Sequence, residues 1–176
     1  TDLVTLVERE ERIEDIAKDV VFHFNSKKIV IPKGKAMLCA TTKKAAAKYY
    51  EYIRKQPNAP KCICIISGGV KTKDPTKKQI EKEKYLKEHY RTKKQIKDLV
   101  EDFKDEDNDV ELLIVCDMYL TGFDAPLLHT LYVDKPLRDH NLFQAASRVN
   151  RMWKPQKIAG LVIDYIGIAD DLKKSF

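Results

Sequence analysis

Long apolar runs are missing from this sequence of 176 residues, and none approaches the length of a membrane span. The first residues do not form a secretory signal either. With 43% hydrophobic and 34% charged residues, we expect a soluble, cytoplasmic domain that has no membrane contact. Position 1 is Thr rather than Met, so we expect the chain to be a piece of a longer protein.

A metal-binding pattern is also missing. The four cysteines all lie in apolar, strand-like runs, their C-x-C spacing is not a zinc pattern, and the four histidines are far apart in the sequence. We therefore expect buried, reduced thiols and no metal site. The cysteines are Cys39, Cys62, Cys64 and Cys116.

The chain further lacks the residues that hold and hydrolyse ATP. None of the six glycines begins a G-x-x-x-x-G-K-[ST] loop, which would wrap the phosphates and place a magnesium ligand. The acidic run Asp105 to Asp109 has no apolar strand before it, as a Walker B site would, and no carboxylate–lysine nuclease cluster is evident. The chain alone is therefore predicted to bind no ATP or Mg²⁺ and to have no ATPase activity.

What the sequence does contain is an alternation of apolar runs with helical patterns, which predicts an α/β domain with a mostly parallel sheet. The helical period over 13–24, the helix from 43 with Ala46, Tyr49, Tyr50 and Ile53 inside, and the capping box Thr92 to Gln95 predict helices. Residues 29–31 are predicted to be extended, and the Lys-rich residues 71–91 to be a partly ordered insertion. The predicted strands are 36–40, 62–66, 112–116, 130–133 and 161–166, and a last helix is expected from Ile168.

Charge is distributed unevenly along the chain. Residues 35–70 have a net charge of +6, from 7 Lys or Arg and 1 Glu, which equals the net charge of the whole chain. Residues 71–97 have +7 and residues 98–111 have −7, so these two blocks cancel. A basic face can attract nucleic-acid phosphates, but Lys-rich helices also simply keep a protein in solution.

The stretch from Thr121 to Arg151 carries the most information about function. A TGFDAP loop follows the predicted strand 112–116, which is where open α/β sheets place ligands. A helix follows, with Asp139 as a candidate N-cap. On a helical wheel it has an apolar face of Leu142, Ala146, Val149 and Trp153, and an opposite polar face of Gln144, Ser147, Arg148 and Arg151. Without its context, this polar face would be read as an ordinary solvated surface.

Two short motifs in this stretch resemble those of superfamily 2 helicases and translocases. Thr121-Gly122-Phe123-Asp124 resembles motif V, and the segment from Gln144 to Arg151 resembles motif VI, Q-x-x-G-R-x-x-R, with Ser147 in place of the usual Gly. The wider text, from TGFDAP to GLVIDYIGIADDLKK, is similar to the motor (R) subunit of type I restriction enzymes. This resemblance begins at about Gly34 and implies a RecA-like three-layer α/β/α lobe over residues 35–176. The helical period and the extended residues before it predict a linker helix and an extended segment over residues 1–34.

The resemblance also implies roles for individual residues. Arg148 and Arg151 would be arginine fingers, which reach the γ-phosphate from a second domain. Gln144 would orient near the phosphates, Asp124 would hydrogen-bond the ribose, and Gly122 would let the backbone approach the nucleotide. The residues expected to contact the DNA backbone are Thr121, Thr41, Thr42, Ser67 and Gly68. The alternative for Asp124 is a turn or helix cap, and for Thr121 a turn hydroxyl.

For the complete enzyme, the resemblance implies ATP- and Mg²⁺-dependent translocation on double-stranded DNA, coupled to cleavage. The partners would be a first RecA-like lobe, a nuclease domain, and the methylation and specificity subunits. One alternative is another superfamily 2 motor, such as an RNA helicase or a remodeller, although its motif VI would more often read H-R-x-G-R or Q-R-x-G-R. Another is a non-catalytic α/β DNA-binding module, in which the two arginines would have no effect on any ATPase.

Overall fold

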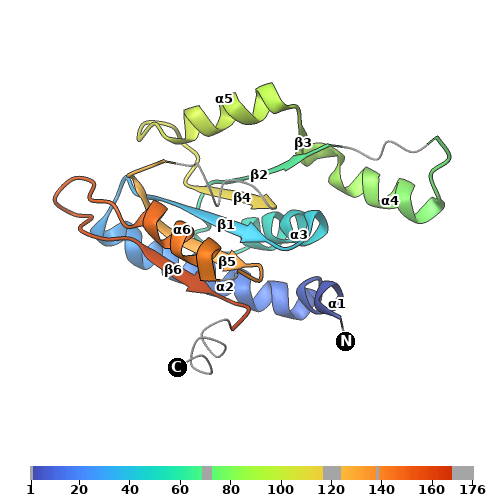
Figure 1. The fold of residues 1–176 in the computed structure, drawn as a ribbon, viewed down its shortest axis with the longest axis horizontal. Helices are drawn as coiled ribbons and strands as arrows, with labels where there is room; N and C mark the ends of the chain where they lie inside the picture. Colours follow the sequence, from blue (N-terminus) through green and yellow to red (C-terminus); the bar gives the residue numbers. More distant parts are fainter. Residues whose placement is uncertain (1, 69–72, 117–123, 138, 168–176) are drawn as a thin grey trace.

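The computed structural model describes residues 2–68, 73–116, 124–137 and 139–167, with only the backbone of 139–142. Within these ranges, six parallel strands form one sheet in the order β3-β2-β4-β1-β5-β6 (Figure 1). The five predicted strands are confirmed, and β3 is an addition. The strands are β1 (Lys35–Ala40), β2 (Cys62–Ser67), β3 (Tyr90–Arg91), β4 (Leu112–Cys116), β5 (Leu128–Asp134) and β6 (Leu161–Asp164).

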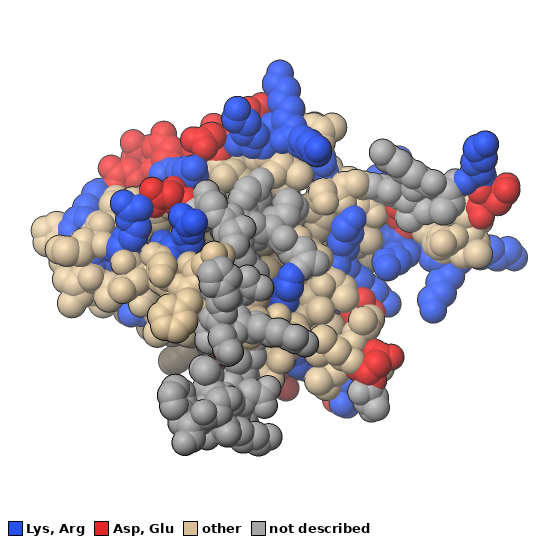
Figure 2. Space-filling model, in the orientation of Figure 1, with Lys and Arg blue, Asp and Glu red and all other residues tan. Residues whose placement is uncertain are grey.

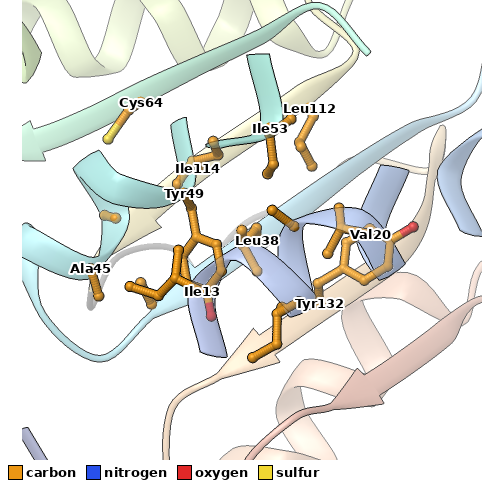
Figure 3. Close-up of a cluster of buried hydrophobic side chains, with 14 of the residues drawn as sticks. Ile13, Val20, Leu38, Ala45, Tyr49, Ile53, Cys64, Leu112, Ile114 and Tyr132 are labelled. Atoms are coloured by element: carbon orange, nitrogen blue, oxygen red, sulfur yellow. The ribbon is translucent and has the colours of Figure 1, made fainter. Parts of the chain in front are cut away.

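Helices cover both faces of the sheet, which gives a three-layer α/β/α architecture (Figure 1). Side chains alternate along β1, so Leu38 points toward α2 and α3 while Met37 points toward α5 and α6. Figure 3 shows the first of these cores, where Ile13 and Val20 of α2 and Tyr49 of α3 meet the sheet. The helices are α1 (Leu3–Val7), α2 (Glu10–Val30), α3 (Lys43–Arg54), α4 (Lys77–Leu86), α5 (Lys93–Phe103) and α6 (Asp139–Val149), with a 3₁₀ turn η1 (Lys87–His89).

Helix α2 confirms the predicted period and extends it. All six apolar positions predicted to face inward are buried: Ile13, Ile16, Ala17, Val20, Val21 and Phe24. The extended conformation predicted for residues 29–31 is wrong, because the helix runs through Val30 and only Ile31 leaves it. The last turn of the helix contains Lys27 and Lys28, and basic residues stabilise a helix C-terminus. This effect outweighs the strand preference of the apolar residues 29–31.

The segment predicted to be a partly ordered insertion contains regular elements. Residues 77–86 form α4, which begins with a capping box between Thr76 and Gln79, and β3 pairs with the end of β2. Leu86 and His89, at the end of α4 and in η1, are 1% and 4% exposed. The segment is thus anchored by a few inward side chains at its C-terminal end rather than by a periodic apolar face. Residues 71 and 72 lie outside the described residues.

The inner faces of the other helices follow the sequence closely. In α3, Ala46, Tyr49 and Ile53 are buried as predicted, although Tyr50 is partly exposed. In α5, the predicted capping box between Thr92 and Gln95 is present and the apolar face packs on the sheet. The helix expected from Ile168 lies outside the described residues.

The cysteines are free thiols, and burial is confirmed for Cys39 and Cys64, whereas Cys62 and Cys116, also expected to be buried, are partly exposed. Burial raises the pKa of Cys39 to about 12 and that of Cys62 to about 11, so these sulfurs are protonated and unreactive. Among the described residues, no group of three or more His, Cys, Asp or Glu could hold a metal ion. No described helix is both long and apolar enough to cross a bilayer.

Candidate functional site

Helix α6 connects two parallel strands, β5 and β6, so its C-terminal end returns toward the edge of the sheet where strands begin. It packs through Ala145 and Val149, which are 0% and 1% exposed. Ala146, predicted to lie on the apolar face, is only partly buried, because the face that meets the sheet is rotated by about one residue. Val149 is confirmed, while the side chain of Leu142 and that of Asp139, the candidate N-cap, lie outside the described residues.

Trp153 does not belong to the α6 face either, because the helix ends at Val149. It lies in a following turn, where its backbone forms an isolated antiparallel bridge with Lys157. The ring is partly exposed and lies 4.6 Å from the ammonium of Lys154. The prediction that Trp153 continues the apolar face of the helix is therefore wrong.

The polar side of α6 lines a hollow of about 210 Å³. Four residues that were expected at a nucleotide site meet there. Gln144 and Arg148 lie on α6, Arg151 follows it, and Asp124 lies in the loop before β5. Phe143 joins them with 77% of its surface exposed, which the sequence reasoning missed, although an aromatic residue directly before a polar motif is a usable signal. The lining residues are Asp124, Phe143, Gln144, Ser147, Arg148 and Arg151.

Ser147 occupies the motif position where a glycine is usual. Its hydroxyl donates a hydrogen bond of 2.8 Å to the carbonyl of Phe143, one turn earlier in the helix. This bond to the preceding turn satisfies the hydroxyl within the helix. The substitution is therefore accommodated without a change in the helix.

Two guanidinium groups and one carboxylate give the hollow a net positive charge. Arg151 Nη1 donates to Asp124 Oδ1 at 2.6 Å, and both side chains are about half exposed, at 51% and 50%. Arg148 lines the same hollow from the last turn of α6 and is partly exposed. An open, positively charged hollow with an amide beside it suits an anionic ligand such as a phosphate chain.

The residues expected to contact DNA lie elsewhere, at the edge where the strands end. Thr41 follows β1, and its hydroxyl donates to the carbonyl of Asp134 at 2.6 Å. Thr42 caps α3 by accepting from the amide of Ala45 at 3.0 Å, and its hydroxyl donates to Glu8 Oε1 at 2.8 Å. Both hydroxyls thus also hold the local structure together.

Ser67 ends β2 and Gly68 follows it at the same edge, and both are exposed. Gly68 has a φ of +85°, a conformation that side chains rarely adopt. The ammonium of Lys43 donates to the carbonyl of Ser67 at 2.5 Å and brings a positive charge to this edge. Sequence reasoning missed Lys43, although a lysine directly after Thr41 and Thr42 is a visible signal. Thr121 and Gly122 lie outside the described residues.

The acidic turn over 105–109 lies at the opposite edge. Figure 2 shows its acidic side chains gathered over the end of α5, with basic side chains beside them. Glu106 forms an ion pair with Lys154, which brings this turn next to the segment that follows α6. The acidic turn therefore lowers the positive charge near the hollow, and at the other edge Glu8 lies near the ammonium of Lys44 at 3.9 Å.

Comparison with known proteins identifies sequences related to this chain. The family model described as type I restriction enzyme subunit R domain 3 matches residues 32–167. The putative type I restriction enzyme MjaIXP endonuclease subunit of Methanocaldococcus jannaschii is 46% identical over 166 residues, covering 94% of this chain and 15% of that protein. The type I restriction enzyme HindI endonuclease subunit of Haemophilus influenzae is 34% identical over 176 residues, covering 96% of this chain and 16% of that protein. The chain thus spans about one sixth of these relatives.

Solved structures share the fold at low sequence identity. T4 UvsW superposes with a TM-score of 0.55 at 10% identity, over 92% of this chain and 27% of that one. Domain 2 of the DEAD-box helicase Mss116p, solved bound to an RNA duplex, has a TM-score of 0.51 at 15% identity, over 88% of this chain and 50% of that one. These likenesses confirm the predicted RecA-like α/β fold of a helicase lobe.

Proposed function

This chain belongs to the type I restriction enzyme subunit R family, and from that premise we propose that it forms the second RecA-like lobe of the DNA-translocating motor in such a subunit. In this proposal the lobe supplies arginine fingers to ATP hydrolysis and contacts to the DNA backbone. Residues 35–176 form the lobe, and residues 1–34 join it to what precedes it in the longer subunit, with α2 packed on the lobe's own core.

One observation carries the nucleotide part of the proposal: Asp124, Gln144, Arg148 and Arg151 meet around one open hollow. They are separated by up to 27 positions in the sequence, yet the fold places their functional groups on one surface. The guanidinium of Arg151 is already oriented by its bond to Asp124. Pre-oriented donors stabilise charge that develops during a reaction better than donors that must first reorganise.

The donor set fits one side of a nucleotide. Bound ATP supplies the phosphoryl bond whose hydrolysis drives movement. Arg148 and Arg151 would neutralise the charge on the transferring phosphoryl group, and Gln144 would donate to a phosphate oxygen. Asp124 would accept from ribose hydroxyls. Because no cluster of metal ligands occurs among the described residues, we assign Mg²⁺ and the phosphate-binding loop to the first lobe.

For DNA we propose backbone contacts along the edge where β1 and β2 end. The exposed loop at Ser67 and Gly68, with the Lys43 ammonium beside it, suits phosphate oxygens. Thr41 and Thr42 would contact the DNA strand although their hydroxyls already form hydrogen bonds within the lobe. Thr121 is proposed to contact the same DNA strand. Such contacts read no sequence, which suits a motor that must step along any duplex. In the complete cytoplasmic enzyme, the nuclease domain and the methylation and specificity subunits would supply cleavage and site recognition.

The arginine variants test the proposal. In the complete subunit, Arg148→Ala or Arg151→Ala is expected to lower DNA-stimulated ATPase and translocation by a factor on the order of 10³ to 10⁵, the range known for arginine fingers. Arg54→Ala is the matched control, because Arg54 is an exposed arginine on α3 that stacks over Tyr50 and does not line the hollow. Normal turnover in both arginine variants would contradict the proposal and favour a non-catalytic DNA-binding module.

A further inference from the structure

Lys157 is a buried lysine that no motif marks. It follows the turn after α6, and its side chain is 0% exposed. Its ammonium donates a hydrogen bond of 2.6 Å to the carbonyl of Pro126, two residues after Asp124. Burying the charged ammonium costs desolvation free energy, which a flexible apolar side chain of the same size would avoid.

The segment that carries Lys157 folds back tightly against the end of α6. Trp153 N donates to Lys157 O at 2.9 Å, and the reverse bond is 3.3 Å, which closes a turn containing Lys154 at a φ of 56°. Gly160 lies so close to α6 that an added Cβ would stand 1.9 Å from the carbonyl oxygen of Val149. Residues 150–160 therefore have little freedom to shift along the helix.

Two contacts join this returning segment to the loop before β5. Arg151 donates to Asp124, and Lys157 donates to Pro126. The first contact is half exposed and screened by water, so it holds its partners weakly by itself. The second joins the ammonium of Lys157, a residue that is 0% exposed, to the carbonyl of the partly buried Pro126, so water screens it less than the first. The Lys157 contact is therefore the stronger restraint on how the two segments, and with them Arg151 and Asp124, stand relative to each other.

The charge of Lys157 is also affected by its position near Arg151. Burial, with the charge of Arg151 nearby as the next cause, lowers the pKa of Lys157 to about 8. Lys157 thus lies near enough to Arg151 for their charges to interact, although its ammonium is committed to a carbonyl and does not reach the hollow. It can act on a bound anion only through the residues that it holds.

We propose that Lys157 is a positioning residue of the nucleotide site, which fixes the loop carrying Asp124 to the segment carrying Arg151 and so sets the direction of the Arg151 guanidinium. The inference rests on the proposed function of Arg151. It assigns to this chain a residue that supports the arginine finger from behind without touching the nucleotide.

The test is Lys157→Met in the complete subunit, with Lys48→Met as the matched control. Lys48 is 9% exposed and its ammonium also donates to one backbone carbonyl, that of Glu8 at 3.0 Å, but on the α3 side of the sheet. Both variants are expected to lower the melting temperature. Only Lys157→Met should lower kcat of the DNA-stimulated ATPase, on the order of 10- to 100-fold as for a misplaced catalytic group, with KM for ATP within about twofold.

A double variant separates positioning from a general loss of structure. If Lys157 acts through Arg151, Lys157→Met combined with Arg151→Ala should be no slower than Arg151→Ala alone. Full additivity of the two losses would overturn the proposal, as would a kcat for Lys157→Met equal to that of Lys48→Met. If Lys157→Met fails to fold, Lys157→Leu, which also removes the N–H donor, carries the same test with the same expected order of rates.

Failure of the inference and failure of the proposed function give different results. A normal rate in Arg151→Ala would remove the proposed function of Arg151 and with it the reason for positioning that residue. A slow Arg151→Ala with a normal Lys157→Met would overturn the positioning role alone.

Discussion

Asp134 is a fully buried carboxylate at the end of β5, and two groups from distant parts of the chain bind it. Arg12 of α2 donates to its two oxygens at 2.9 and 2.5 Å, and the hydroxyl of Tyr49 donates at 2.5 Å. The hydrogen bond to Asp134 raises the pKa of Arg12, so the guanidinium stays charged. This network joins α2 and α3 to the sheet at a point directly beside Thr41.

Removing one partner of Asp134 should be costly because it leaves a buried charge without compensation. Arg12→Met is expected to lower the free energy of unfolding by about 3–5 kcal/mol, and Tyr49→Phe by about 1–3 kcal/mol. Arg9→Met, at an exposed position on the same side of the chain, should change it by less than about 0.5 kcal/mol. Urea denaturation of the four proteins measures the differences, and an Arg12→Met variant as stable as wild type would contradict the role of Arg12 in compensating the buried carboxylate.

His129 should make stability depend on pH. It is 1% exposed, burial lowers its pKa from 6.5 to about 3, and its Nε2 has no hydrogen-bond partner among the described residues. The unfolded chain binds a proton at this residue between pH 6.5 and 3 and the folded chain does not, so its contribution is complete above pH 6.5 and is lost as the pH falls toward 3.

The loss should be on the order of a few kcal/mol, since each pKa unit corresponds to about 1.4 kcal/mol. His129→Gln should flatten the fall in unfolding free energy between pH 6.5 and 4. His23 and His89 also have pKa values lowered by burial, so His23→Gln is the control and should flatten it less. Equal slopes for wild type and His129→Gln would contradict the assignment.

At the scale of elements, the charged helix α4 packs on the rest of the domain mainly through its C-terminal end. Leu86 is 1% exposed, whereas Ile80 on the same helix is 51% exposed. Leu86→Ala should therefore cost about 2–5 kcal/mol of unfolding free energy, and Ile80→Ala less than about 0.5 kcal/mol. Thermal and urea unfolding of the two variants measure this. Similar small losses in both would mean that α4 is only loosely attached, as the sequence had suggested.

Elements with an internal signal were predictable from the sequence. The strands β1, β2 and β4 lie between the two cores and are mostly apolar runs, and α5 begins with a capping box formed by its own residues. Helix α4 has its capping box too, but its anchors are few and charge dominates its composition. The one-residue rotation of α6 could not be predicted, because Ala145 and Ala146 are equivalent until the position of β5 and β6 is known.

The candidate site was predictable only where motifs mark it. Arg148, Arg151, Gln144 and Asp124 were predicted from two short motifs, and the fold brings them to one hollow. Phe143 and Lys157 were not predicted, because their importance comes from where the chain folds back and no local pattern records that. From the sequence, we expected the nucleotide to bind where β4 ends. In the structure, the hollow is separate from the edge of the sheet where β1 and β2 end.

At the scale of the whole molecule, this separation predicts where DNA binds. The acidic turn lies at the edge where strands begin, and Lys43 lies at the other. The chain should bind unrelated duplexes with equal, weak affinity that falls steeply with salt. Lys43→Gln should reduce the slope of log affinity against log salt by about one, and Lys33→Gln, beside Asp107 of the acidic turn, should not. Fluorescence anisotropy at several salt concentrations measures both, and a salt-resistant preference for one duplex would indicate a sequence reader.

The central claim is that Arg148 and Arg151 act on the transition state of ATP hydrolysis. The most direct measurement is the affinity of the complete subunit, with DNA and Mg²⁺, for ADP with aluminium fluoride and for a slowly hydrolysed ATP analogue. Arg148→Ala and Arg151→Ala should weaken binding of the aluminium fluoride complex by nearly the factor by which they lower kcat, while the ATP analogue binds within a few-fold of wild type. Equal losses for both ligands, or none for either, would contradict the account.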